Sequence, residues 1–448
     1  MSSSRRSFLA RATALAALVT AAPRSLLARA GPAAGVAGRS GGDGQRLPRT
    51  RDGLPVVPRG ELAADFWRRL RSEFLIPPGE AFFNTGTMGS SPRVVLDAVI
   101  EHMTHVDRDV AHWDYKDGHE NYFTGYYEEN WLREKIARLI NAEAAEIALT
   151  QNATIAMNFF ANGLPVERGD EVVVMEGAHP GGRAGWQLRD KRYGVNVRWV
   201  EVPMPPESPE QLVSLYEKAT TDRTRVWAIP HLTSATAVLF PVEEMCRRAR
   251  QRGIITVIDG AQTFGHLAID VQKMGCDAFF TSPHKWLLAP KGTGFLYVRK
   301  GVLASVWPTL ASGNYDNQED GGFRLMQNGT GNLSLLRGLG KACDFHANLG
   351  PARVEARVVG LADRLRAGLR RIKGVRILSP LHRELRSATT VWTLDGVESM
   401  KLQDTLWDRA RVRVRRLKDR GVRQCCHIYN LEEEVDRTLE TVHQLANA

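Results

Sequence analysis

Cysteine is scarce in this sequence of 448 residues, and the few cysteines present are not spaced as disulfide partners or metal ligands. Their number is odd, and no regular spacing indicates a disulfide framework. None of them forms the Cys-x-x-Cys pair of a structural zinc site. We therefore expect a fold without a disulfide scaffold and a functional site without a metal. The five are Cys246, Cys276, Cys343, Cys425 and Cys426.

A long apolar run is also missing from the N-terminal region. The apolar stretch from Ala12 to Ala22 is shorter than the roughly 20 residues that a membrane-spanning helix needs, so we expect no stable membrane anchor. It follows the paired arginines of the segment SRRSFLA, residues 4–10, and precedes the small-residue sequence Ala28-Arg29-Ala30. These three features together are typical of a twin-arginine export signal, and the alternative is a disordered basic tail.

The export signal predicts both a location and a partner. We expect residues 1–30 to be the signal, the twin-arginine export machinery to be a partner, and the mature protein to be periplasmic or otherwise extracytoplasmic. Residues 31–60 are rich in Gly, Pro, Ala and Arg and have few large apolar side chains, which predicts a flexible linker.

Acidic residues are absent from residues 1–30, and this absence accounts for half of the basic character of the chain. The formal net charge is +10, and removal of the five arginines in that segment leaves +5. The rest of the sequence has no stripe of Lys and Arg with interleaved aromatic residues, which nucleic-acid-binding proteins often show. We therefore expect a solvated surface and no nucleic-acid partner.

Apolar runs of strand length alternate with helical stretches through residues 61–344. This alternation predicts an α/β large domain with a doubly wound, mostly parallel sheet and an N-terminal arm. Residues 345–448 change in pattern and predict a smaller α+β C-terminal domain, and no internal repeats occur. The expected strands are 146–150, 171–175, 195–200, 225–230, 254–258, 277–281, 375–378 and 388–394, and the expected helices include 126–141, 351–371 and 431–446.

Two of the expected strands end in residues that suggest cofactor chemistry. Asp259 ends one apolar run, and Ser282-Pro283-His284-Lys285 follows the next. Because ligands bind at the carboxyl ends of parallel strands, we expect these residues to meet at one edge of the sheet. A lysine there can bond covalently to an aldehyde cofactor, and a carboxylate can keep a pyridine nitrogen protonated. Taken singly, Asp259 could be a turn residue and Lys285 a surface lysine.

Together these residues resemble the pyridoxal 5'-phosphate (PLP) signature of class V aminotransferases. The segment HKWLLAPKGTGFLYVR, residues 284–299, is most similar to the isopenicillin N epimerase-like branch. The resemblance covers about residues 61–446. It implies PLP fold type I, PLP as the cofactor, Lys285 as the catalytic lysine, an amino-acid-like substrate and a homodimer.

The resemblance also implies roles for the residues around the cofactor phosphate. Ala153 and Thr154 open a helix, and both would contact the phosphate, although an ordinary helix cap would look the same. Ser282 and His284 match the family pattern Ser-x-His-Lys, whose side chains also contact the phosphate. Thr330 resembles a family threonine that reaches the phosphate from the neighbouring subunit, and a plain Gly-Thr turn is the alternative.

Four further residues are implied at the ring and at the substrate. His179 aligns with the histidine that stacks on the pyridine ring, and Gln262 with the glutamine that hydrogen-bonds the phenolic oxygen. Arg423 matches the arginine that binds the substrate α-carboxylate, a role that suits guanidinium geometry. Asn84 lies in a glycine-rich segment that family members place over the substrate. The sequence departs from the family at Cys425, where a serine is usual.

The cofactor motifs leave the reaction open. Lys285 is the expected base for the α-proton, and epimerisation, transamination and β-elimination all follow from its removal. A cysteine desulfurase needs a mobile-loop cysteine ahead of the carboxylate-binding arginine, and residues 411–423 contain none. An aminotransferase, a C-S lyase and a PLP-binding protein without turnover remain alternatives to an epimerase-like enzyme. Specificity is expected from the loops at 84–89, 113–122 and 312–316.

Overall fold

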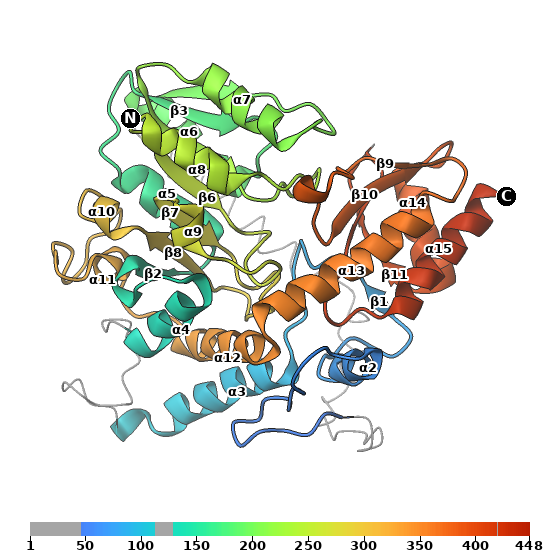
Figure 1. The fold of residues 1–448 in the computed structure, drawn as a ribbon. Coiled ribbons are helices and arrows are strands. Elements are labelled where there is room, and N and C mark those ends of the chain that lie inside the picture. Colours follow the sequence, from blue (N-terminus) through green and yellow to red (C-terminus); the bar gives the residue numbers. More distant parts are fainter. Residues whose placement is uncertain (1–45, 113–128, 419) are drawn as a thin grey trace, which may run out of the picture. The chain divides into compact units, whose positions relative to one another are not determined.

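The computed structural model describes residues 46–112, 129–418 and 420–448, and these belong to one compact unit (Figure 1). The predicted export signal, most of the predicted linker and the loop at 113–122 lie outside the described residues. Residues 46–60, the last part of the predicted linker, lie against the body of the protein. Arg49 pairs with the buried Glu73, and Asn348 donates to the carbonyl of Pro55.

A seven-stranded sheet organises the larger part of the fold. Its strand order is β2-β8-β7-β6-β5-β3-β4, and β8 is the one strand of this sheet that runs in the direction opposite to the others. This arrangement confirms the mostly parallel α/β sheet that the sequence predicts. The strands are β2 (Ile147–Thr150), β3 (Glu171–Met175), β4 (Asn196–Val200), β5 (Thr224–Pro230), β6 (Ile255–Asp259), β7 (Ala278–Thr281) and β8 (Gly294–Val298).

Helices surround this sheet because most of its strands are buried. The strands β2, β3, β7 and β8 are buried along their whole length. The elements around and before the sheet are α2 (Ala64–Arg71), α3 (Arg93–Arg108), η2 (Val110–His112), α4 (Asn130–Ile140), η3 (Ala144–Glu146), α5 (Ala153–Gly163), α6 (Pro180–Tyr193), α7 (Pro209–Ala219), α8 (Val242–Gln251), α9 (Val271–Met274), α10 (Lys300–Leu303), α11 (Gly321–Met326) and α12 (Leu333–Leu349).

A four-stranded antiparallel sheet with the order β12-β13-β10-β9 forms the C-terminal part, with α13, α14 and α15 beside it (Figure 1). A short parallel pair, β1 with β11, joins the N-terminal arm to this part. The elements are β1 (Ala81–Phe82), α13 (Pro351–Leu369), β9 (Val375–Ile377), η4 (Arg383–Leu385), β10 (Thr389–Leu394), α14 (Ser399–Ala410), β11 (Val412–Arg413), β12 (Arg415–Arg416), β13 (Val422–Cys425) and α15 (Glu432–Ala446).

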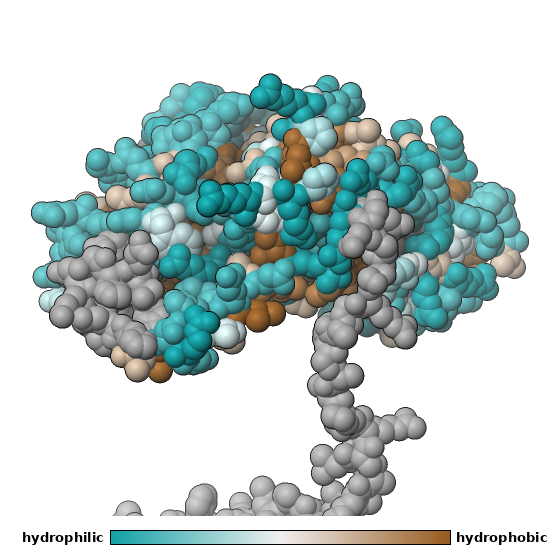
Figure 2. Space-filling model, turned by 90° about the horizontal axis from the view of Figure 1, so that it is seen from below, coloured by the Kyte–Doolittle hydropathy of each residue, from teal (hydrophilic) through white to brown (hydrophobic). Residues whose placement is uncertain are grey.

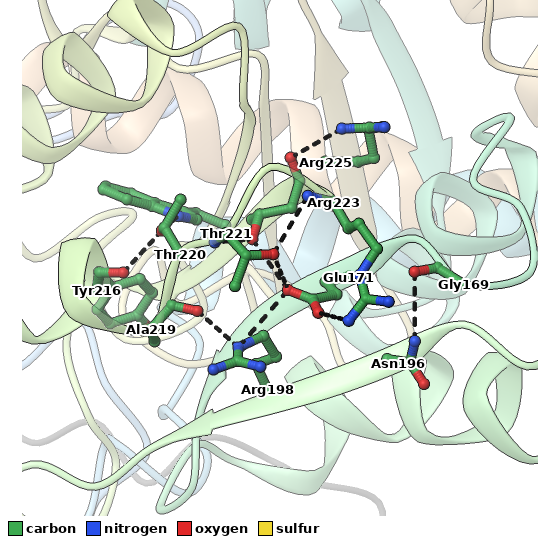
Figure 3. Close-up of polar contacts among 12 residues, drawn as sticks. Gly169, Glu171, Asn196, Arg198, Tyr216, Ala219, Thr220, Thr221, Arg223 and Arg225 are labelled. Atoms are coloured by element: carbon green, nitrogen blue, oxygen red, sulfur yellow. Dashed lines mark hydrogen bonds and ion pairs between the residues drawn. The ribbon is translucent and has the colours of Figure 1, made fainter.

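The amino-terminal edge of the large sheet is held by a buried carboxylate (Figure 3). Glu171 begins β3 and is 1% exposed, and it accepts hydrogen bonds from Thr221 and from Arg223. Arg198 on β4 lies 3.6 Å from the same carboxylate. Burial alone would raise the pKa of Glu171, but these hydrogen bonds and charges outweigh it and lower the pKa. The network joins β3, β4 and the turn before β5, at the edge opposite to the strands' carboxyl ends.

One face of the molecule is largely hydrophilic (Figure 2). Figure 2 shows one face of the molecule on which hydrophobic residues form small patches between hydrophilic ones. Within the described ranges, no helix combines the length and the apolar character that membrane crossing requires. All five cysteines are buried and free.

Candidate active site

The carboxyl ends of β6 and β7 bring Asp259 and Lys285 to the same edge of the sheet. The two strands are parallel neighbours, and Asp259 pairs with Phe280 in their register. Ser282 to Lys285 follow β7 directly. Packing permits this close approach because residue 260 is glycine, and a Cβ atom there would lie 1.9 Å from the ring of Phe279.

Lys285 is held in surroundings that favour its neutral amine. Burial is the main cause that lowers its pKa, and the positive charges of Arg423 and Arg415 lower it further. The carboxylate of Asp259 acts in the opposite direction and raises it. A lysine with a lowered pKa is a better nucleophile near neutral pH, and it can also accept a proton from a bound substrate.

Asp259 supplies a carboxylate that lacks a cationic hydrogen-bond partner among the described residues. Its Oδ1 accepts a hydrogen bond from the main-chain nitrogen of Ala261 at 3.0 Å. Burial raises the pKa of Asp259, whereas this hydrogen bond and the charges of Lys285 and His179 lower it. A protonated pyridine nitrogen is the kind of group that such a carboxylate stabilises.

The first turn of α6 lies directly against this carboxylate. Residue 182 is glycine, and a Cβ atom there would lie 2.5 Å from Oδ2 of Asp259. The missing side chain therefore leaves room for the carboxylate and for whatever group it faces.

The amino terminus of α5 meets the residues just before Lys285. The main-chain nitrogen of Ala153 donates to Oγ of Ser282 at 2.8 Å, and Ser282 is 5% exposed. Thr154 is exposed. It lies next to the first turn of α6, because a Cβ atom on Gly181 would be 2.7 Å from Oγ1 of Thr154. The positive end of a helix and two hydroxyl groups are suited to a phosphate. The structure thus brings Ala153, Thr154 and Ser282 into one region.

His284 belongs to the same turn and has an unused buried nitrogen. Its Nδ1 has no hydrogen-bond partner within the described chain. Burial lowers the pKa of His284 to about 4, and the charges of Lys285 and Lys291 contribute. The neutral ring can therefore donate a hydrogen bond to an anionic group, as the prediction of a phosphate contact requires.

His179 caps α6 at the same edge of the sheet. Its Nδ1 accepts from the main-chain nitrogen of Gly181 at 3.0 Å, which fixes the position of the ring. Partial burial is the main cause that lowers the pKa of His179, followed by the charge of Lys285. The ring remains exposed, and so presents a face on which a flat cofactor can stack.

Gln262 connects the N-terminal arm, which contains Gly86, to the lysine turn, residues 282–286. Its Nε2 donates to the carbonyl of Gly86 at 2.8 Å, and its Oε1 accepts from Nε1 of Trp286 at 2.9 Å. One amide hydrogen of Gln262 remains for the contact with a phenolic oxygen that the sequence predicts. The bond to Trp286 was not predicted, because nothing in the sequence pairs residue 262 with the residue after the lysine.

Arg423 enters the site from β13 and contacts Asn84. It is 3% exposed, and its Nη2 donates to Oδ1 of Asn84 at 3.1 Å and to Oγ1 of Thr87 at 2.9 Å. Its Nη1 donates to the carbonyl of Ser234 at 2.7 Å. Its Nε is buried without a partner among the described residues. Burial is the main cause that lowers the pKa of Arg423.

Thr330 makes no hydrogen bond with these groups within the described part of the single chain. It is exposed in the turn between α11 and α12. Its role toward the phosphate of a neighbouring subunit stays a prediction.

Sequence reasoning missed a stack of buried aromatic rings behind the lysine turn. His266 stacks on Trp286 at 4.1 Å between ring centroids, and His427 stacks on Tyr429 at 4.9 Å. Trp286 and His427 join the two pairs at 5.5 Å, and Nε2 of His427 contacts the carbonyl of Trp286 at 2.9 Å. The stack fixes the residue next to Lys285 to the loop that follows β13. The sequence gives no signal for it because its members are distant in the chain.

The residues at this edge fit PLP in several independent respects. They provide a largely buried lysine, a carboxylate on the adjacent strand, a helix terminus beside Ser282, an exposed histidine ring and a buried arginine. Together with the mostly parallel sheet and the C-terminal antiparallel sheet, they define a PLP-dependent enzyme of fold type I.

Comparisons with known proteins identify the family. The family model described as "Aminotransferase class-V" matches residues 82–438, and the chain belongs to this family. Isopenicillin N epimerase of Amycolatopsis lactamdurans is 31% identical over 408 residues, covering 86% of this chain and all of that protein. Isopenicillin N epimerase of Streptomyces clavuligerus is 29% identical over 402 residues, covering 86% and 99%. These relatives support the epimerase-like branch.

Cysteine desulfurases are also similar. A probable cysteine desulfurase of Xylella fastidiosa is 28% identical over 399 residues, covering 83% of this chain and 93% of that protein. The apo structure of the cysteine desulfurase of Thermococcus onnurineus has a TM-score of 0.73 at 23% identity, covering 84% of this chain and 97% of that one. A C-DES mutant with glycine covalently linked to PLP has a TM-score of 0.73 at 23% identity, covering 83% and 98%. The structural likeness confirms the fold.

The contact between Gly182 and Asp259 yields a test of the cofactor pocket. In Gly182→Ala, the added methyl group would push the carboxylate out of place at a cost of about 1–3 kcal/mol. We expect the affinity for PLP to fall about tenfold or more. Titration of the apoprotein with PLP, followed by visible absorption, measures this affinity. Gly360→Ala is the matched control, because a Cβ atom there meets open space. Equal PLP affinity of Gly182→Ala and wild type would contradict the assignment of Asp259.

Proposed function

We propose that this protein is an exported, PLP-dependent enzyme that moves the α-proton of an amino acid or an amino-acid-derived amine, in the manner of an epimerase. The observation that carries the proposal is the placement of Lys285 at the same sheet edge as Asp259, close enough to that carboxylate and to Arg423 for both charges to act on its pKa. The two isopenicillin N epimerases that match nearly their whole length support the branch.

The residues divide the work between binding and proton transfer. When bound, PLP supplies an electron sink for negative charge at the substrate α-carbon. Arg423 would hold the substrate α-carboxylate, with Asn84 and Thr87 fixing its guanidinium group. Lys285 Nζ would accept the α-proton, and its lowered pKa favours the neutral amine that this step requires. In an epimerisation, a proton then returns to the opposite face of the same carbon.

Supporting residues keep these groups oriented. Asp259 would hold the pyridine nitrogen in its protonated form, and His179 would present its ring to the cofactor plane. Ser282, His284 and the amino terminus of α5 would bind the phosphate. The hydrogen bond from Trp286 to Gln262 keeps the lysine turn beside the N-terminal arm. The complete set favours an enzyme over a protein that binds PLP without turnover.

A cysteine desulfurase is the main alternative among the relatives, and one structural observation counts against it. Cys425 and Cys426 are the cysteines next to Arg423, and both are 0% exposed. Cys425 lies in β13, where its main-chain nitrogen donates to the carbonyl of Phe83. Desulfurases need a thiol on a mobile loop, whereas these thiols are packed in the fold. An aminotransferase or C-S lyase remains distinguishable by its product.

The reaction is tested by incubating the holoenzyme with L- and D-amino acids in deuterated water. We expect deuterium at the α-carbon and interconversion of the enantiomers, with neither keto acid nor sulfide formed. In Arg423→Gln, loss of the carboxylate contact should weaken amino-acid binding by about 2–5 kcal/mol and leave the cofactor absorption intact. Chiral chromatography and mass spectrometry provide the readout. Formation of keto acid would instead identify a transaminase or an eliminating lyase and refute the epimerase proposal.

We propose export because residues 1–30 have the features of a twin-arginine signal. These are the paired Arg5 and Arg6, a short apolar core and the small-residue sequence Ala28-Arg29-Ala30. A twin-arginine signal suits a cofactor enzyme, because that route carries folded proteins. Cell fractionation should find the wild-type enzyme outside the cytoplasm, and the double substitution Arg5→Lys and Arg6→Lys should retain it inside. Arg11→Lys is the control. A wild-type protein that stays in the cytoplasm would refute the proposal.

A further inference from the structure

Two arginines converge on one hydroxyl group at the candidate active site. Arg415 on β12 and Arg423 on β13 are directly opposite each other in the antiparallel register. Side chains at opposed positions of such a pair lie on the same face. Nη1 of Arg415 donates to Oγ1 of Thr87 at 2.7 Å, and Nη2 of Arg423 donates to the same atom at 2.9 Å.

This arrangement leaves two positive charges without a negative one between them. Neither Arg415 nor Arg423 forms an ion pair with an acidic residue in the described part of the chain, and Thr87 is a neutral acceptor. Lys285 adds a third basic group, and both arginines act on its titration. Like charges this close repel each other, and bound anions relieve that repulsion.

The two arginines differ in solvent exposure, and this difference suits them to two different anionic groups. Arg423 is 3% exposed, and three of its donor contacts are already taken by Ser234, Asn84 and Thr87. Arg415 is exposed, and among the described residues its guanidinium group donates to Thr87 alone. Its remaining N–H groups are available to a ligand that approaches from solvent.

We infer that Arg415 binds a second anionic group, carried on the side chain of the amino-acid substrate, while Arg423 binds the α-carboxylate. The substrate class is then an acidic amino acid or a derivative with an anionic side chain. This inference rests on the proposed function. A guanidinium group suits a carboxylate, because it offers two parallel N–H donors.

The experiment compares matched substrates in the holoenzyme and in Arg415→Gln. The pairs are glutamate with glutamine and aspartate with asparagine, which differ in charge and hardly in shape. Binding is measured as the change in cofactor absorption during titration. We expect the wild type to bind the acidic member about five- to tenfold more tightly, and Arg415→Gln to lose most of this preference. The preference should shrink as salt concentration rises.

Arg416→Gln is the matched control. It removes the same charge from the adjacent exposed position, and successive residues of a strand point to opposite faces. The control should keep the wild-type preference for acidic members. A preference that Arg416→Gln and Arg415→Gln lose equally would show general charge attraction and overturn the inference.

Other outcomes separate this inference from the proposed function. Equal binding of both members of each pair by the wild type would overturn the role of Arg415 and leave the α-carbon chemistry standing. An equal loss of affinity for both members in Arg415→Gln would assign Arg415 to the support of Thr87 and the α-carboxylate. Failure of every amino acid to change the absorption of the loaded enzyme would overturn the proposed function and this inference together.

Discussion

The candidate site depends on holding an amine and a carboxylate, those of Lys285 and Asp259, where water is largely excluded. Exclusion of water penalises both charges, which is why the pKa of Lys285 is lowered and that of Asp259 is raised. Each group partly compensates the other. The parallel pairing of β6 and β7 creates this situation, since it delivers both residues to one edge of a sheet that is buried on both faces.

The rest of the structure keeps this pair in place and adds the groups it needs. At one end, α5 meets Ser282 through the hydrogen bond from Ala153. Behind the lysine turn, the stack from His266 to Tyr429 ties Trp286 to the loop after β13. That loop follows the strand that carries Arg423. The same packing therefore positions Lys285 and Arg423, although they are 138 positions apart in the sequence.

Most of the large sheet could be predicted, because its strands are continuous apolar runs of strand length. The six strands expected there are present, with ends that differ by no more than one residue. The antiparallel β8 was not predicted, although its run Gly294–Val298 is apolar and buried. The two-residue strands β1, β11 and β12 were also missed, since such short pieces have no periodicity to detect.

In the site as well, residues next to a predicted strand could be found from the sequence, whereas residues set apart only by contacts with distant parts of the chain could not. Asp259, Ser282 and Lys285 follow apolar runs, so strand ends predicted their meeting. Arg415 was missed because it is one of many arginines between residues 409 and 423, and only its pairing opposite Arg423 sets it apart. Thr87 was missed as well, because its contacts come from β12 and β13, far along the chain.

The most direct test of the account is to locate the covalent link between the protein and its cofactor. The protein is loaded with PLP, reduced with borohydride to make the link permanent, digested, and its peptides are weighed by mass spectrometry. We predict one cofactor on the peptide that contains Lys285, no cofactor in Lys285→Ala, and an unchanged result in Lys291→Ala, which removes an exposed lysine six residues further on. Attachment at Lys291, or a cofactor still attached in Lys285→Ala, would contradict the central claim.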